Sequence, residues 1–134
     1  MKLTPYLMFN GTCEEALNFY SNTIGGEIKQ LSRFEGSPAE SMSADKQKIL
    51  HATFEGNNIS FMASDGSGLS AGNTGNIHLC IDFKDTVAME NVFTALSEGG
   101  KITMPLEDTF WGAKFGMMTD RFGINWMFNC EKEN

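Results

Sequence analysis

The residues of this 134-residue chain that could hold a metal ion are few and widely spaced. Its two histidines, His51 and His78, fall in segments that read as separate β-strands, and Cys80 follows the second by two residues. Two histidines from different strands, joined by a carboxylate such as Glu107 or Asp108, would make a facial site for iron or zinc. A strand histidine is more often a half-buried, hydrogen-bonded residue, so the metal site stands as the alternative.

A second group of candidates lies nearer the C-terminus and is mostly aromatic. Trp111, Phe115 and Met127 would suit a pocket for a flat or apolar ligand, whereas core packing would explain any one of them alone. If Asp108 were desolvated beside Trp111, burial would raise its pKa toward the range of a general acid or base; otherwise it is a solvated strand end. No spacing indicates a nucleophile with its base, so no catalytic residue is assigned. The candidate pocket residues are His51, His78, Asp108, Trp111, Phe115 and Met127.

Hydrophobic periodicity predicts a strand, a helix and three strands in the first half of the chain. Apolar residues repeat at helical spacing from Ala16 to Ile24, after a Thr12–Glu15 pair of capping-box type and before Gly25-Gly26. A turn at Gly56-Asn57 joins two of the strands into a hairpin. The predicted strands cover residues 3–9, 27–34, 48–55 and 58–64.

The same order of elements recurs after a connector rich in Gly and Ser. A strand over 76–83 and a helix over 86–98 are followed by Gly99-Gly100, as the first helix is by Gly25-Gly26. The last two strands, 113–119 and 124–130, form a hairpin around Asp120 to Gly123. The recurrence predicts an internal duplication within one domain, with module 1 over about 1–65, a linker over 66–75 and module 2 over about 76–130.

Two such modules define an α+β fold. One module cannot bury both faces of its sheet, so we expect two tandem βαβββ modules whose strands form a curved, mostly antiparallel sheet with the helices outside. The concave side, away from the helices, is then the natural place for a ligand pocket. Strand edges left exposed by this arrangement also predict a homodimer.

Several motifs resemble one family. The segments ALNFY at 16–20, FWG at 110–112 and TDRFGINW at 119–126 are similar to the PhnB-like branch of the glyoxalase/bleomycin resistance/dioxygenase superfamily, also called the vicinal oxygen chelate (VOC) superfamily. Members of this branch are often labelled 3-demethylubiquinone-9 3-methyltransferase-like. The resemblance covers nearly the whole chain and implies the paired-module VOC fold. The chain lacks the Gly-rich turn of a methyl-donor site, so the methyltransferase label does not fit it.

The resemblance also implies where a VOC enzyme would bind a divalent metal. The four ligand places fall at Pro5, between Phe61 and Ser64, at Asn76 and at Met127, and none supplies an imidazole or a carboxylate. We therefore predict a small-molecule-binding protein without the usual metal ligands and without a cofactor. The alternative is a metal-dependent VOC enzyme (lyase, isomerase, dioxygenase or resistance-type transferase) with displaced ligands such as His51, His78 and a carboxylate.

The amino-acid composition limits which partners and which cellular compartment are expected. A hydrophobic fraction of 41% and a charged fraction of 20% are typical of a folded globular protein. The net charge of −7 argues against nucleic acid and anionic membranes as partners, since both require clustered Lys and Arg. The sequence shows no membrane span and no signal peptide, and its three cysteines form no CxxC pair. We expect a cytoplasmic protein with reduced thiols.

Overall fold

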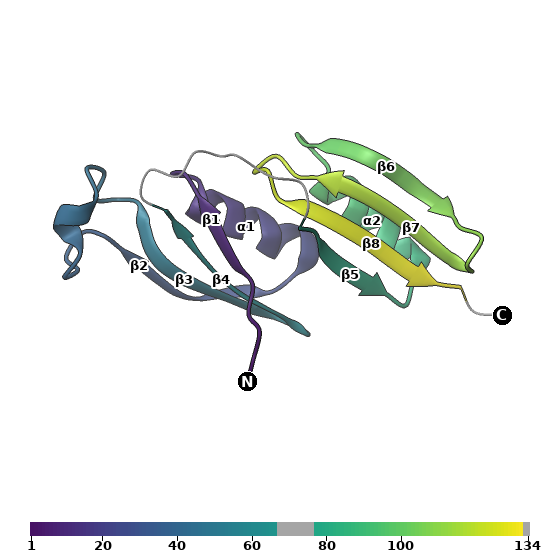
Figure 1. Ribbon diagram of the computed structural model, residues 1–134, viewed down its shortest axis with the longest axis horizontal. Helices are drawn as coiled ribbons and strands as arrows, with labels where there is room; N and C mark the ends of the chain where they lie inside the picture. The colour runs from purple at the N-terminus through teal and green to yellow at the C-terminus, as the bar shows by residue number, and fades with distance from the viewer. Residues whose placement is uncertain (67–76, 133–134) are drawn as a thin grey trace. The chain divides into compact units, whose positions relative to one another are not determined.

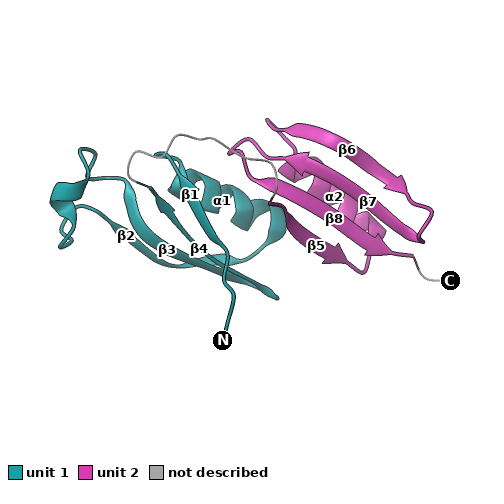
Figure 2. Cartoon of the chain, viewed as in Figure 1, with its two compact units in different colours: residues 1–72 teal, residues 73–134 magenta. Residues whose placement is uncertain are grey.

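The computed structural model describes residues 1–66 and 77–132 of the chain. These residues belong to two compact units, residues 1–72 and residues 73–134 (Figure 2). The predicted linker, 66–75, lies almost entirely outside the described residues. No described helix is long and apolar enough to cross a membrane.

The first unit is a mixed four-stranded sheet with one long helix. Its strands lie in the order β1-β4-β3-β2, with β1 parallel to β4 and the other neighbours antiparallel (Figure 1). A short 3-10 helix, Glu40–Met42, lies between β2 and β3. The elements are β1 (Tyr6–Phe9), α1 (Cys13–Ile24), β2 (Glu27–Arg33), β3 (Ile49–Gly56) and β4 (Ile59–Asp65).

The second unit repeats this topology. Its strands lie in the order β5-β8-β7-β6, again with one parallel pair, β5 and β8. The elements are β5 (Leu79–Phe83), α2 (Thr86–Leu96), β6 (Lys101–Asp108), β7 (Ala113–Thr119) and β8 (Asn125–Glu131). The predicted α+β fold of two tandem βαβββ modules is therefore confirmed, and the predicted arms of the last hairpin are accurate to about one residue.

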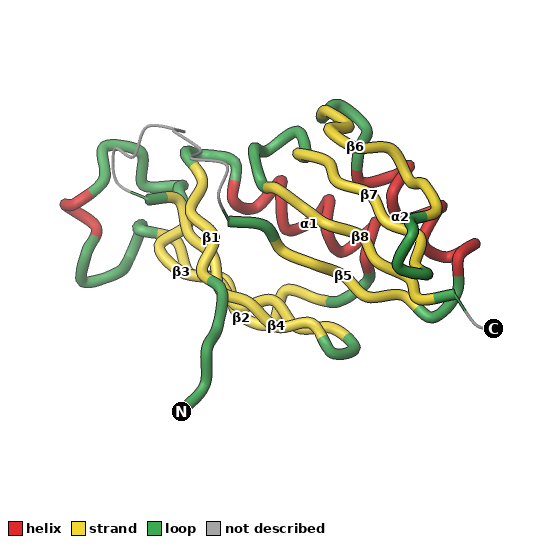
Figure 3. Tube along the Cα trace, turned by 45° about the vertical axis from the view of Figure 1, so that its right-hand side comes forward, coloured by secondary structure: helices red, strands yellow, loops and turns green. Residues whose placement is uncertain are grey.

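Each helix packs on one face of the sheet of its own unit. Figure 3 distinguishes the helices from the strands along the chain. In the first unit Leu17 and Tyr20 of α1 are fully buried, and Phe54 stacks on Phe61 beneath them with ring centroids 4.8 Å apart. In the second unit Phe128 lies between Phe83, at 5.6 Å, and Phe93 of α2, at 5.1 Å. Burial of these aromatic rings contributes to the apolar core of each unit.

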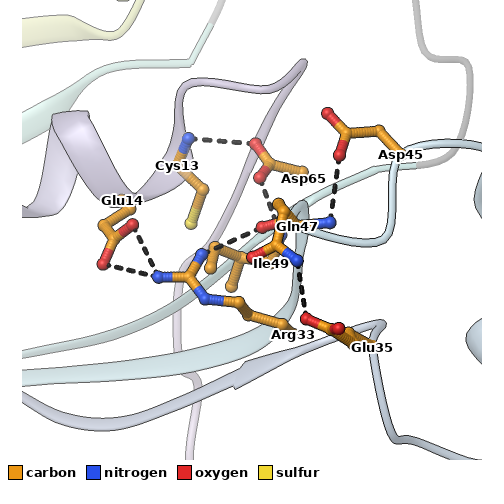
Figure 4. A network of polar contacts seen from close by, with 8 residues as sticks. All are labelled: Cys13, Glu14, Arg33, Glu35, Asp45, Gln47, Ile49 and Asp65. Carbon is orange, nitrogen blue, oxygen red and sulfur yellow. Dashed lines mark hydrogen bonds and ion pairs between the residues drawn. The ribbon is translucent and has the colours of Figure 1, made fainter.

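A buried carboxylate, rather than the predicted capping box, holds the start of α1. Thr12 is the N-cap residue, yet its side chain makes no capping hydrogen bond. Asp65, at the end of β4, accepts hydrogen bonds from the backbone N–H groups of Cys13 and Ile49, both at 2.9 Å (Figure 4), and from that of Gly11 at 2.8 Å. The capping-box prediction is wrong because a residue distant in sequence supplies the acceptor.

A second polar network ties the segment between β2 and β3 to α1. The guanidinium of Arg33 pairs with both carboxylate oxygens of Glu14, at 2.9 and 3.0 Å, and donates to the carbonyl of Gln47 at 2.9 Å (Figure 4). The Gln47 side chain donates in turn to Glu35 at 2.6 Å, and the Gln47 backbone N–H donates to Asp45 at 3.0 Å. This segment has few apolar residues, so side-chain hydrogen bonds define its path.

Several boundaries differ from those predicted, and β5 begins at Leu79 rather than at residue 76. β1 begins at Tyr6 rather than Leu3, and the carbonyl of Pro5 accepts from Met62 just before the strand starts. The β3–β4 turn is Asn57-Asn58 rather than Gly56-Asn57; Asn58 has the positive φ of 61° that such a turn requires. The second helix ends at Leu96, two residues earlier than predicted.

Candidate functional site

Each sheet has one face against its helix and one open face. Residues paired across neighbouring strands point to the same side, so the register assigns every side chain to a face. In the first unit the helix face holds the buried Phe54, Phe61 and Ala63. The open face holds the residues that alternate with them, which are Tyr6, Met8, His51, Thr53, Ser60, Met62 and Ser64.

His51 and Tyr6 form a polar pair on the open face of the first sheet. The Tyr6 hydroxyl lies 3.2 Å from His51 Nδ1, and the two rings are 5.8 Å apart. The pair reaches from edge strand β1 across β4 to β3, past Met62, which is opposite Tyr6 in the register. Tyr6 was not among the predicted site residues, because only the strand order β1-β4-β3 brings it beside His51.

The open face of the second sheet carries Phe115 and Met127 of the predicted pocket residues. Met127 lies opposite Met117 of β7 and Cys80 of β5, and Phe115 lies opposite Asn129. Asn129 donates a hydrogen bond of 2.9 Å to Asp82. This face therefore combines sulfur and aromatic groups with a polar amide–carboxylate pair.

Trp111 lies at the bend between β6 and β7. Its ring is 55% exposed and makes edge contacts with Phe115 at 6.0 Å and with the exposed Phe110 at 4.9 Å. A shallow hollow of about 540 Å³ adjoins Trp111 within the second unit, and it is lined by Trp111, Gly112, Ala113, Asn129, Glu131 and Lys132. The rings of Trp111 and Phe115 are therefore neighbours, although Phe115 is not among the residues that line the hollow.

Asp108 and His78 have different surroundings. Asp108 is exposed and pairs with Lys132 at 2.6 Å; this hydrogen bond is the main reason that the pKa of Asp108 is lowered. A carboxylate in this setting is ionised at neutral pH, so the desolvated general acid considered from the sequence does not form. His78 is half-buried and directly precedes β5.

The thiols are poor nucleophiles. Burial, and after it the nearby carboxylates of Asp65 and Glu14, raises the pKa of Cys13 to about 12. Partial burial, and then the charge of Asp82, raises the pKa of the exposed Cys80. Both thiols are protonated at neutral pH, whereas a reactive cysteine needs its pKa lowered.

At the predicted ligand places that the structure describes, the side chains are not the usual donors of a divalent VOC site. Met127 lies on the open face of β8, and Met62 and Ser64 lie on the open face of β4, where ligands from those strands would be. Pro5 has no coordinating side chain, and Asn76 falls outside the described residues. Within residues 1–66 and 77–132, no group of three or more His, Cys, Asp or Glu side chains is placed to hold a metal ion.

The architecture defines the class of protein. Two βαβββ units, each with a mixed sheet covered by one helix, make up the glyoxalase/bleomycin resistance/dioxygenase fold. The chain superposes on a domain of that description from Frankia sp. EAN1pec with a TM-score of 0.69, covering 98% of both chains at 11% identity. This similarity concerns the fold alone.

The family follows from closer relatives. The model of the 3-demethylubiquinone-9 3-methyltransferase family matches residues 1–128. The chain is 39% identical to a crystal structure of a Pseudomonas aeruginosa protein (TM-score 0.88, 99% of both chains covered). It is 32% identical to the PhnB protein of Bacillus cereus, described as a 3-demethylubiquinone-9 3-methyltransferase by similarity (TM-score 0.83, 97% and 99% covered). It is also 32% identical to Protein YjdN of Escherichia coli (99% and 97% covered). The chain belongs to this PhnB-like family.

Proposed function

We propose that the chain is a small-molecule-binding protein whose ligand lies on the open face of the first sheet and needs no metal ion. Membership of the PhnB-like family and the duplicated VOC fold support a ligand-binding role. The observation that carries the proposal is the Tyr6–His51 pair, which places two hydrogen-bonding groups beside Met62 on the face that α1 leaves uncovered. Binding sites commonly have this composition, with a few polar groups that orient a mostly apolar ligand.

The pair provides one directed polar anchor. His51 Nδ1 and the Tyr6 hydroxyl engage each other at 3.2 Å, and the tautomer decides which of them donates. Among the described residues no partner of His51 Nε2 is found, so this nitrogen is available to a ligand as a donor or as an acceptor. A ligand with one hydroxyl, carbonyl or amine group fits this anchor.

The residues around the Tyr6–His51 pair indicate the chemical character of the rest of the ligand. Met8 is 52% exposed on β1, and Met62 is half-buried on β4 next to Tyr6. Methionine side chains adapt to irregular apolar shapes, so they suit a flat or branched hydrocarbon body better than a highly charged one. We therefore propose a small, largely apolar or aromatic molecule with one hydrogen-bonding group.

The experiment is a fragment screen by protein-observed NMR, followed by titration of the best hit into wild type and two variants. Tyr6→Phe removes only the hydroxyl, and His51→Phe removes the imidazole while keeping a ring. Loss of one hydrogen bond should raise the dissociation constant by about tenfold. Val87→Ala, at an exposed position on α2, is the control and should leave the affinity unchanged.

Hits that bind all variants equally, and that do not shift His51 ring resonances, would overturn the proposal. Elemental analysis of protein purified without chelators tests the metal-dependent alternative, and stoichiometric iron or zinc would favour it. Trp111, Phe115 and Met127 are further candidate contacts in the second unit. Because both tryptophans lie there, fluorescence reports separately on binding to that unit.

A further inference from the structure

The open face of the second sheet carries four sulfur-containing side chains abreast, and the outermost is Met104 of β6, the register partner of Met117. Cys80 of β5 is the register partner of Met127 of β8, and Met127 is the register partner of Met117 of β7. Directly opposed residues in neighbouring strands have Cα atoms about 5 Å apart and side chains on the same face. Met127 therefore lies between a thiol and a second thioether.

The burial of neighbouring residues shows that these sulfurs lie on the open face. Trp126 and Phe128, on either side of Met127 in β8, are buried, and Phe128 contacts Phe93 of α2. Met118 is 1% exposed, whereas Met117, which directly precedes it, is only half-buried. Cys80 is exposed. The row is therefore on the side of the sheet opposite α2.

We propose that Cys80, Met127 and Met117 form a binding site for a soft monovalent cation, Cu(I), for which Ag(I) is a redox-stable substitute. One thiolate and two thioethers make up a ligand set that soft d¹⁰ ions prefer and that hard divalent ions do not. The long, unbranched methionine side chains allow both sulfurs to turn toward an ion near the thiolate. The net charge of −7 further favours a cation over an anion.

Binding involves no change of oxidation state. The S–H bond of Cys80 breaks, its proton passes to solvent, and a sulfur–metal bond forms with the electron pair left on sulfur. The two methionines contribute lone pairs and release no proton. The nearest carboxylate in the register, Asp82, accepts a hydrogen bond from Asn129 at 2.9 Å, so it is already engaged and is not part of the proposed ligand set.

The test is a titration with silver nitrate in chloride-free buffer, followed by calorimetry and native mass spectrometry. The proposal expects one saturable Ag(I) per chain with one proton released. Cys80→Ser should abolish this site, and Met127→Leu or Met117→Leu, which keep side-chain volume but remove sulfur, should each weaken binding on the order of tenfold. Met8→Leu, on the first unit, is the matched control and should leave binding unchanged.

Methyl NMR of ¹³C-methionine-labelled protein locates the ion directly. Met127 and Met117 signals should shift on silver addition, while that of the buried Met118 should stay in place. Absence of saturable binding would overturn the proposal, and so would equal affinity in wild type and both leucine variants, which would mean capture by the thiol alone. Circular dichroism melts establish that each variant is folded. This test and that of the Tyr6–His51 proposal use different variants and different probes, so each can fail without the other.

Discussion

In the second unit the indole Nε1 of Trp126 donates a hydrogen bond of 2.9 Å to Oδ2 of Asp120, and both residues are buried. The other oxygen of the same carboxylate accepts from the backbone N–H groups of Phe122, at 2.8 Å, and Ile124, at 3.1 Å. One side chain therefore fixes the turn before β8 and the orientation of the tryptophan that follows it. These hydrogen bonds of Asp120 are the physical basis of the motif TDRFGINW, which resembles the PhnB-like family.

Asp120→Ala should lower the free energy of unfolding by about 3 kcal/mol, because it leaves buried N–H donors without this acceptor. Urea denaturation at neutral pH measures the loss. Asp82→Ala is the control, since Asp82 is exposed, and it should change stability by less than about 1 kcal/mol. A double-mutant cycle with Trp126→Phe should show coupling of about 1–2 kcal/mol; strict additivity would argue that the hydrogen bond contributes little.

Asp65→Ala should lower the free energy of unfolding by about 3 kcal/mol, whereas Thr12→Ala should change it by less than about 0.5 kcal/mol. Asp65 accepts from three backbone N–H groups, while the Thr12 side chain makes no capping bond. Chemical denaturation of both variants measures the contrast. Asp45→Ala serves as control, because Asp45 is an exposed acceptor for one backbone N–H. A larger effect at Thr12 than at Asp65 would contradict the assignment of the cap.

Gly100→Ala should destabilise the second unit by about 3 kcal/mol or more. A Cβ at Gly100 would press on the carbonyl oxygen of Thr119 and lie 2.9 Å from Asp120 Cα, both of which are backbone atoms. Gly123→Ala is the matched comparison in the same unit: Gly123 has a φ of 89° but no atom within 4 Å of an added Cβ, so only backbone strain of about 1–2 kcal/mol is expected. Thermal unfolding of the two variants distinguishes steric conflict from strain, and equal shifts would contradict the close approach.

Stability should fall at alkaline pH through Cys13. Its thiol has a pKa raised from 9.0 to about 12 in the folded protein, so the folded state holds a proton that the unfolded state has lost between these values. The contribution is fully present below pH 9 and is lost as the pH rises toward 12, with a limiting slope of about 1.4 kcal/mol per pH unit. Denaturation of wild type and Cys13→Ala from pH 8 to about 11 measures it. Cys13→Ala will also lower stability at every pH because its side chain is smaller. If the free energy of unfolding nevertheless changes with pH in the same way in both proteins, the account is contradicted.

The homodimer stays a prediction. β1 and β2 are the outer strands of the first sheet and β5 and β6 those of the second, and strands in such positions offer backbone groups for pairing. Sedimentation velocity over a range of protein concentrations measures the assembly state. A chain that sediments as a monomer throughout that range would contradict the prediction.

The α+β class, the two modules and most helix and strand limits were predictable because they depend on local periodicity. Apolar spacing in α1 and α2 and the turn chemistry at Asp120–Gly123 are contained in short stretches of sequence. The glycine pairs Gly25-Gly26 and Gly99-Gly100 marked the duplication for the same reason. The site candidates Trp111, just before β7, and Phe115, within β7, could be paired from the sequence because they are four residues apart.

Only the tertiary structure decided which distant residues meet. Strand order and register place Tyr6 beside His51, Cys80 beside Met127, and Asp65 at the start of α1, and each contact joins segments more than 40 residues apart. A one-residue change of register would move every side chain of a strand to the other face. Sequence periodicity defines the two faces of a strand but carries no information about its neighbouring strands. Which residues share each open face could therefore be determined only from the strand order and register of the folded sheet.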